Sequence, residues 1–314
     1  MKNDMLNVLF GLGLAGLLSC GPSQSMVSEQ FAAADEVTTD DQELSTARYS
    51  YVTFKRDMRR CISPLCGGFW VTPVNKPTAT PTYVSGLDFS VSTLDDAVIA
   101  KLYDGEAGEV VLKGRLGPAE SRFNTRPLMV QAAWRGLPGA TIATGSWTYI
   151  VDSHDIRCFT WPCPTLDARR IGSYSHTMFS NVVMGVEVSR LNNAWLVDRV
   201  KNHGALVAGT FVDGAKGPAG TEKNLKAEQV FLKIDDMTGP CPVFKLAACP
   251  SGQVRAYSQN ENLCQMPGAC VKRGICPLYA LMRCADGYSM QAWASAPNGC
   301  YAYACSPSFV VDAE

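Results

Sequence analysis

Short stretches of alternating apolar and polar residues recur along the chain and predict strands that bury one face. Between residues 110 and 116 every second position is apolar or Gly, and residues 128–134 and 229–234 are similarly rich in apolar side chains. In residues 94–102 the apolar positions instead recur every three or four residues, which predicts an amphipathic helix. The pattern therefore indicates a domain built from strands and short helices.

Two of the predicted strands contain a glycine near their middle, at Gly114 and Gly209. A glycine has no side chain to pack on a sheet, so in mid-strand it usually marks a bulge or a close approach of two backbones. We expect an irregularity of the sheet at both positions.

The predicted elements occur twice in the same order between residues 48 and 238. Four segments match at separations of 95 to 99 residues: 60–66 with 157–163, 86–90 with 185–189, 94–97 with 191–194, and 112–116 with 207–211. The order of strand, Cys loop, strands, helix and two strands is typical of an α+β fold. We therefore predict two tandem repeats, residues 48–140 and 141–238, each a small antiparallel sheet with one helix.

A tighter repeat of about 35 residues follows and predicts a small disulfide-rich tail of two units, residues 239–274 and 275–314. Each unit opens with Cys-Pro, at Cys241 and Cys276, and carries four cysteines. Units of this size cannot fold on an apolar core alone, and disulfides normally supply the difference. Eight cysteines can pair in 105 ways, so the spacing leaves the pairing open.

The cysteine count predicts the environment of the protein. The chain has 314 residues and 13 cysteines. With Cys20 set aside, an even number remains at recurring spacings, which favours structural disulfides in an oxidising compartment. These twelve are Cys61, Cys66, Cys158, Cys163, Cys241, Cys249, Cys264, Cys270, Cys276, Cys284, Cys300 and Cys305.

The N-terminus predicts export and membrane attachment. Lys2 precedes an apolar run at residues 8–18, which is too short to span a bilayer but fits the core of a signal peptide. The run ends in Leu-Leu-Ser-Cys at Cys20, which resembles the bacterial lipobox, and that resemblance implies cleavage after residue 19 and acylation of Cys20. Gly21 rather than Asp follows, which favours the outer membrane. Residues 20–47 are acidic and poor in apolar side chains, so we expect a disordered tether.

Charge and motif content exclude several classes of function. The formal net charge is -1 with a pI of about 6.3, which argues against a nucleic-acid partner. The three histidines are far apart and no Cys-x2-Cys occurs, so we expect neither a metal site nor a cofactor. We interpret Ser153-His154-Asp155 as a polar turn and not as a catalytic triad. Asp88 and Glu187 are interpreted as solvated residues on the exposed face of a strand. We predict no catalytic residues.

Aromatic and Arg residues near the first two Cys loops are the candidates for a binding patch, namely Arg60, Trp70, Arg157 and Trp161. Such residues are enriched in recognition surfaces. The same side chains could pack over their disulfides, and the sequence favours that simpler interpretation.

Two resemblances add to this picture. The Arg-Cys-x4-Cys loops, the strand 67–71 and the Cys-rich tail resemble a domain-of-unknown-function family of secreted myxobacterial lipoproteins, which implies localisation and architecture but no activity. Cys284-x2-Gly-Tyr followed by Asn-Gly-Cys300 resembles the antistasin-type protease-inhibitor module, without its closing Cys-x2-Cys-x-Cys.

These observations together predict a cell-envelope lipoprotein that acts as a binding or structural protein. Its expected partners are the membrane, through acylated Cys20, and an envelope protein or glycan. The alternatives are a secreted serine-protease inhibitor that acts through the tail and a hydrolase with a non-local site.

Overall fold

The computed structural model describes residues 44–103, 108–119, 122–154, 156–185, 191–236, 241–277 and 283–311. The predicted signal peptide, Cys20 and nearly all of the predicted tether lie outside these residues. None of the described helices is long and apolar enough to cross a membrane.

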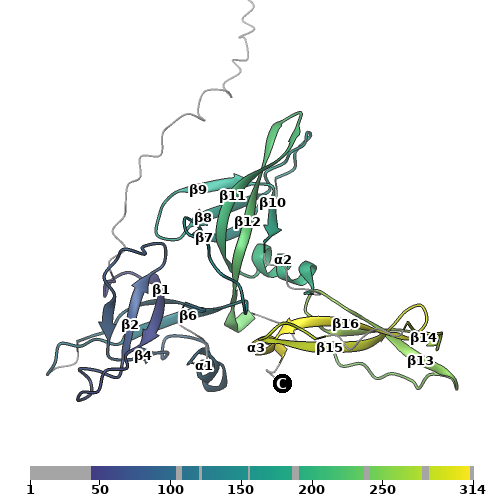
Figure 1. Ribbon diagram of the computed structural model, residues 1–314, viewed down its shortest axis with the longest axis horizontal. Helices are drawn as coiled ribbons and strands as arrows, with labels where there is room; N and C mark the ends of the chain where they lie inside the picture. The colour runs from purple at the N-terminus through teal and green to yellow at the C-terminus, as the bar shows by residue number, and fades with distance from the viewer. Residues whose placement is uncertain are drawn as a thin grey trace, which may run out of the picture. The chain divides into compact units, whose positions relative to one another are not determined.

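One mostly antiparallel sheet of twelve strands forms the body of the protein (Figure 1). Its strands run in the order β3-β2-β1-β5-β6-β12-β11-β7-β8-β9, while β4 pairs in parallel with β6 and β10 in parallel with β12. The bounds are β1 (Ser50–Arg56), β2 (Phe69–Pro73), β3 (Thr82–Val84), β4 (Leu87–Asp88), β5 (Val110–Leu116), β6 (Leu128–Gly136), β7 (Trp147–Ser153), β8 (Leu166–Arg170), β9 (His176–Phe179), β10 (Asn181–Met184), β11 (Leu206–Gly217) and β12 (Gly220–Lys233).

The predicted fold class is wrong. The protein is mostly β, and it is not an α+β protein built from tandem sheet-plus-helix units. The reason is the pairing of β6 with β12, in which Gly136 lies opposite Phe231 and Trp134 opposite Lys233. This pairing joins strands from both predicted repeats into a single sheet.

The described helices are short: α1 (Asp96–Tyr103), α2 (Asn193–Asn202) and α3 (Ser308–Val311), with one 3-10 turn, η1 (Ile234–Asp236).

Both mid-strand glycines lie where the sheet is irregular, as predicted. The register between β5 and β6 shifts at Lys113/Gly114, and the register between β11 and β12 shifts at Ala208/Gly209. A Cβ atom on Gly209 would collide with the backbone carbonyl of Lys226. Glycine is therefore required here because two backbones approach closely.

Buried apolar clusters pack on the sheet and join residues from its two halves. On one face, α2 buries Trp195, Leu196 and Val200 against the strands around β7 and β12. The side chain of Asn192 accepts a hydrogen bond from the Trp195 backbone N–H at 3.1 Å and so caps the start of this helix. A separate cluster around Trp134 and Phe231 covers the β6–β12 junction.

The tail consists of two disulfide-linked hairpins, which are β13 (Gln253–Gln259) with β14 (Gln265–Lys272) and β15 (Tyr288–Ser295) with β16 (Cys300–Pro307). Two bridges tie each hairpin to the segment that precedes it: Cys241–Cys264, Cys249–Cys270, Cys276–Cys300 and Cys284–Cys305. The body carries the short-loop bridges Cys61–Cys66 and Cys158–Cys163. All twelve cysteines predicted to be structural are thus paired.

The tail packs on the body. The Tyr288 hydroxyl donates to the Pro138 carbonyl at 3.2 Å, and burial raises the pKa of Tyr288 to about 12. Leu263 and Phe309 from the tail belong to the same buried cluster as Trp195. The tail therefore completes the core on the α2 side of the sheet.

Candidate functional site

The first Cys loop carries a stacked group of one cation and two aromatic rings. Trp70 on β2 lies opposite Tyr83 on β3, with ring centroids 5.4 Å apart. The Arg59 guanidinium lies 5.0 Å from the Trp70 ring centroid and 5.4 Å from that of Tyr83. These distances fall within the range of cation–π attraction.

A buried carboxylate fixes Arg59 in this position. The Asp57 side chain is only 1% exposed, and the Arg59 Nε–H donates to both of its carboxylate oxygens at 3.0 Å. This hydrogen bond from Arg59 is the main reason why the pKa of Asp57 falls to about 2. Asp57 stays ionised at neutral pH and holds the guanidinium in a set orientation.

Arg59 and Tyr83 also hold the disulfide loop itself. Arg59 donates to the Leu65 carbonyl at 3.2 Å, and the Tyr83 hydroxyl donates to the Pro64 carbonyl at 2.8 Å. The Tyr83 oxygen in turn accepts from the Gly68 N–H at 3.2 Å. The Cys61–Cys66 loop is therefore pre-ordered by the same residues that form the stack.

Beside the stack lies an open groove of about 680 Å³, which is lined by Lys55, Arg56, Asp57, Met58, Arg59, Trp70, Thr80 and Pro81. Three of these residues are cationic and one is anionic, and the anion is already paired with Arg59. Met58 is 80% exposed and adds an apolar surface. The groove can therefore hold a ligand that combines negative charge with a flat or apolar part.

One of the four residues predicted for a binding patch, Trp70, belongs to this group. Trp70 is present, but Arg59 rather than Arg60 lies over its ring, and Arg60 is exposed. Asp57, Arg59 and Tyr83 were missed. The signal that could have revealed Asp57 and Arg59 is their spacing directly after a strand, since a carboxylate and a guanidinium two residues apart in a turn can meet.

The second Cys loop is arranged differently. Trp161 packs its ring over Gly217 at the β11–β12 turn, its carbonyl accepts from the Ala219 N–H at 3.1 Å, and its side chain is 46% exposed. Arg157 is exposed. In this half the guanidinium of Arg170 lies over Trp147 instead, 3.2 Å from the ring centroid. The second loop thus lacks an equivalent of the Arg59 stack among the described residues.

His154 and His176 form no enclosed site among the described residues. His154 and His176 approach the same carboxylate, Asp167, at 4.0 Å and 3.2 Å, but their side chains are 47% and 64% exposed. Neither lines the groove beside Arg59. Asp88 accepts from the Ser90 N–H at 2.9 Å, which lowers the pKa of its carboxyl, while Asp155 and Glu187 lie outside the described residues. Within the described ranges no group of three or more His, Cys, Asp or Glu side chains could hold a metal ion.

Comparison with known proteins shows relatives of unknown function. A family described as "Domain of unknown function (DUF6748)" matches residues 50–237, which cover the whole twelve-stranded sheet and stop before the tail. An uncharacterised protein from Dictyostelium discoideum is 27% identical over 218 residues, which make up 67% of this chain and 72% of that protein. No solved structure matches.

Proposed function

We propose a binding function for this chain, which belongs to the DUF6748 family of domains of unknown function. In this proposal an acidic peptide segment of an envelope protein occupies the groove beside Arg59, Trp70 and Tyr83. The observation that carries it is the Arg59 guanidinium, held over two aromatic rings by a buried carboxylate at the edge of an open cationic groove.

The six disulfides indicate an oxidising, extracytoplasmic environment. The proposal adds that the chain is held at the outer membrane through acylated Cys20. Support for this part comes from the sequence of residues 1–20 alone, and mass spectrometry of the mature N-terminus tests it. An unmodified Cys20 would contradict it.

The chemistry of the groove favours an acidic peptide over a neutral ligand. Among the described lining residues, Lys55, Arg56 and Arg59 outnumber one carboxylate, so a ligand with negative charge gains from complementarity. Met58 and Pro81 offer contacts for an apolar side chain. The strand β3, which begins directly after Pro81, is an edge strand of the sheet. An extended peptide could therefore also pair with β3 as an added strand.

The test is selection from a displayed library of short peptides rich in Asp and Glu, using the full mature chain. We expect saturable binding of acidic peptides that weakens with added salt, and a loss of about tenfold or more in affinity for Trp70→Ala. Trp161→Ala is the matched control, because Trp161 is an exposed Trp on the other Cys loop and should leave affinity unchanged. Equal affinity of the wild type and Trp70→Ala would count against the groove.

A second candidate function is protease inhibition, which the segment between Cys241 and Cys249 favours. This segment forms no strand, and it exposes Val243 (96%) and Phe244 (40%). Disulfides clamp it at both ends, and Arg255 donates to the Ala247 carbonyl at 2.7 Å. An exposed segment held this way is pre-organised for a protease cleft. Titration of the full chain against trypsin and chymotrypsin tests the idea, and undiminished protease activity would exclude it for those enzymes.

A further inference from the structure

A second groove, in the tail, has a chemistry quite unlike that of the Arg59 groove. It has a volume of about 460 Å³ and is lined by Asn192, Tyr257, Ser258, Gln259, Trp293, Ser295, Ala296 and Ala304. These residues come from three places: the cap of α2, strand β13, and the β15–β16 hairpin with the turn that joins its strands. The groove therefore exists only where the two tail hairpins meet the body.

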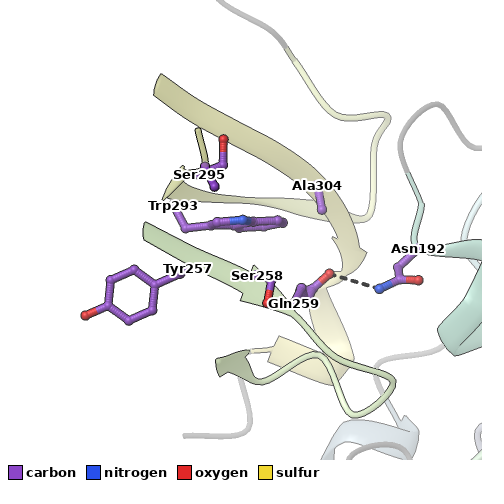
Figure 2. A pocket seen from close by; sticks show the side chains of 8 residues that line it. Asn192, Tyr257, Ser258, Gln259, Trp293, Ser295 and Ala304 are labelled. Atoms are coloured by element: carbon purple, nitrogen blue, oxygen red, sulfur yellow. Dashed lines mark hydrogen bonds between the residues drawn. The ribbon is translucent and has the colours of Figure 1, made fainter. Parts of the chain in front are cut away.

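Figure 2 shows the indole of Trp293 lying flat between β13 and the β15–β16 hairpin. The Asn192–Gln259 hydrogen bond lies toward one end of the groove, and Tyr257 projects outward at the other. Trp293 is half-buried. The indole of Trp293 thus lines the groove between its two ends, with the amides of Asn192 and Gln259 at one of them.

The polar groups of the groove are neutral. Among the described residues, the lining contains the amides of Asn192 and Gln259 and the hydroxyls of Ser258, Ser295 and Tyr257, without Lys, Arg, Asp or Glu. Amides and hydroxyls can each donate and accept hydrogen bonds, as sugar hydroxyls do. The described lining residues therefore offer no counter-charge to a charged ligand.

Hydrogen bonds within the protein hold these polar groups in place. The Gln259 Nε2 donates to Gln291 at 2.8 Å and to the Leu263 carbonyl at 3.3 Å, and its Oε1 accepts from Asn192 at 3.2 Å. Asn192 is itself fixed as the cap of α2. An amide oxygen has two lone pairs and an amide nitrogen two hydrogens, so Gln259 Oε1 and Asn192 Nδ2 each have one hydrogen-bonding position that no bond between described residues occupies.

Ser295 is held in a similar way. Its hydroxyl donates to the Cys300 carbonyl at 2.9 Å, so the oxygen remains an acceptor. Pre-ordered polar groups lose little conformational freedom when a ligand binds.

We infer that this groove binds a neutral saccharide of two or three rings. The apolar C–H face of a pyranose would stack on Trp293, and its hydroxyls would exchange hydrogen bonds with Gln259, Asn192 and Ser295. The volume lies within the range of small-ligand sites, and a largely apolar lining with a few fixed polar groups is their usual composition. The inference is independent of the acidic-peptide groove, since the two share no residue.

The experiment is titration calorimetry of the full mature chain with chitotriose, cellotriose and maltotriose, with trigalacturonate as the anionic counterpart. We expect at least one neutral trisaccharide to bind saturably and trigalacturonate to bind more weakly than it. Trp293→Ala should lower the affinity by about tenfold or more, and Trp293→Phe by less because a ring remains.

Two further variants separate binding from folding. Ser258→Arg changes an exposed position and should block the groove without disturbing the core. Tyr301→Ala removes another aromatic from the same hairpin, 58% exposed and outside the lining, and should leave binding unchanged. The inference is overturned if none of the three neutral trisaccharides binds, if trigalacturonate binds as tightly, or if Ser258→Arg binds like the wild type.

Discussion

At the scale of single residues, the pair of Asp57 and Arg59 decides what the first Cys loop can do. A buried carboxylate must be paired, and here it is paired with the cation that covers Trp70. The sequence indicates that aromatic and Arg residues gather at this loop. Hydrophobic periodicity does not indicate which Arg faces the ring, because residues 57–60 follow the end of β1 and a loop has no periodicity from which side-chain direction can be read.

The ion pair predicts a specific dependence of stability on pH. The pKa of Asp57 is about 2 in the folded protein and near 3.8 in the unfolded chain, so its contribution is present above about pH 4 and is lost as pH falls towards 2. Asp57→Asn should be less stable than the wild type at pH 7, and the gap in free energy of unfolding should narrow between pH 4 and pH 2. Urea unfolding at each pH measures this gap, and a gap that stays constant would show that Asp57 does not act through its charge.

At the scale of elements, the strands and their glycines were easier to predict than their partners. Alternation shows which face of a strand is buried, and a mid-strand glycine shows where two backbones come close, as at Gly209. Neither shows that β6 pairs with β12, since that pairing joins residues about a hundred positions apart. The α+β prediction failed for this reason. It assigned the strands to two small sheets, whereas they form one sheet.

The close approach of two backbones at Gly209 predicts how much a single added methyl group lowers the free energy of unfolding. Gly209→Ala would place its Cβ against the Lys226 carbonyl, and we expect a loss of about 1–3 kcal/mol in the free energy of unfolding. Gly86→Ala is the matched control, because a Cβ there meets nothing within 4 Å, and it should change stability by less than about 0.5 kcal/mol. Urea titration compares the two variants, and equal effects would contradict the bulge geometry.

At the scale of the whole molecule, disulfides and tail packing hold together a chain with little helix. The number and spacing of the cysteines predicted their structural role. They could not select the pairing, which needs the fold: in each tail unit the first cysteine bonds the third and the second bonds the fourth. The Trp293 groove could not be predicted either, because it is assembled from α2 and both hairpins.

This arrangement predicts the outcome of non-reducing peptide mapping. We expect six linked pairs, two of them within the Cys loops of the body and two within each tail unit. A bridge between the two Cys loops, such as Cys61–Cys158, or between the two tail units would contradict the structure.

The central claim is that the Arg59 groove recognises an acidic ligand, and the most direct test compares two neighbouring arginines. Affinity for a selected acidic peptide is measured for the wild type, Arg59→Gln and Arg60→Gln. Both variants remove one positive charge, but only Arg59 lies over Trp70 and lines the groove. We expect Arg59→Gln to weaken binding by about tenfold or more and Arg60→Gln by much less. Equal losses of affinity in the two variants would show that only net charge matters, and would contradict the proposed site.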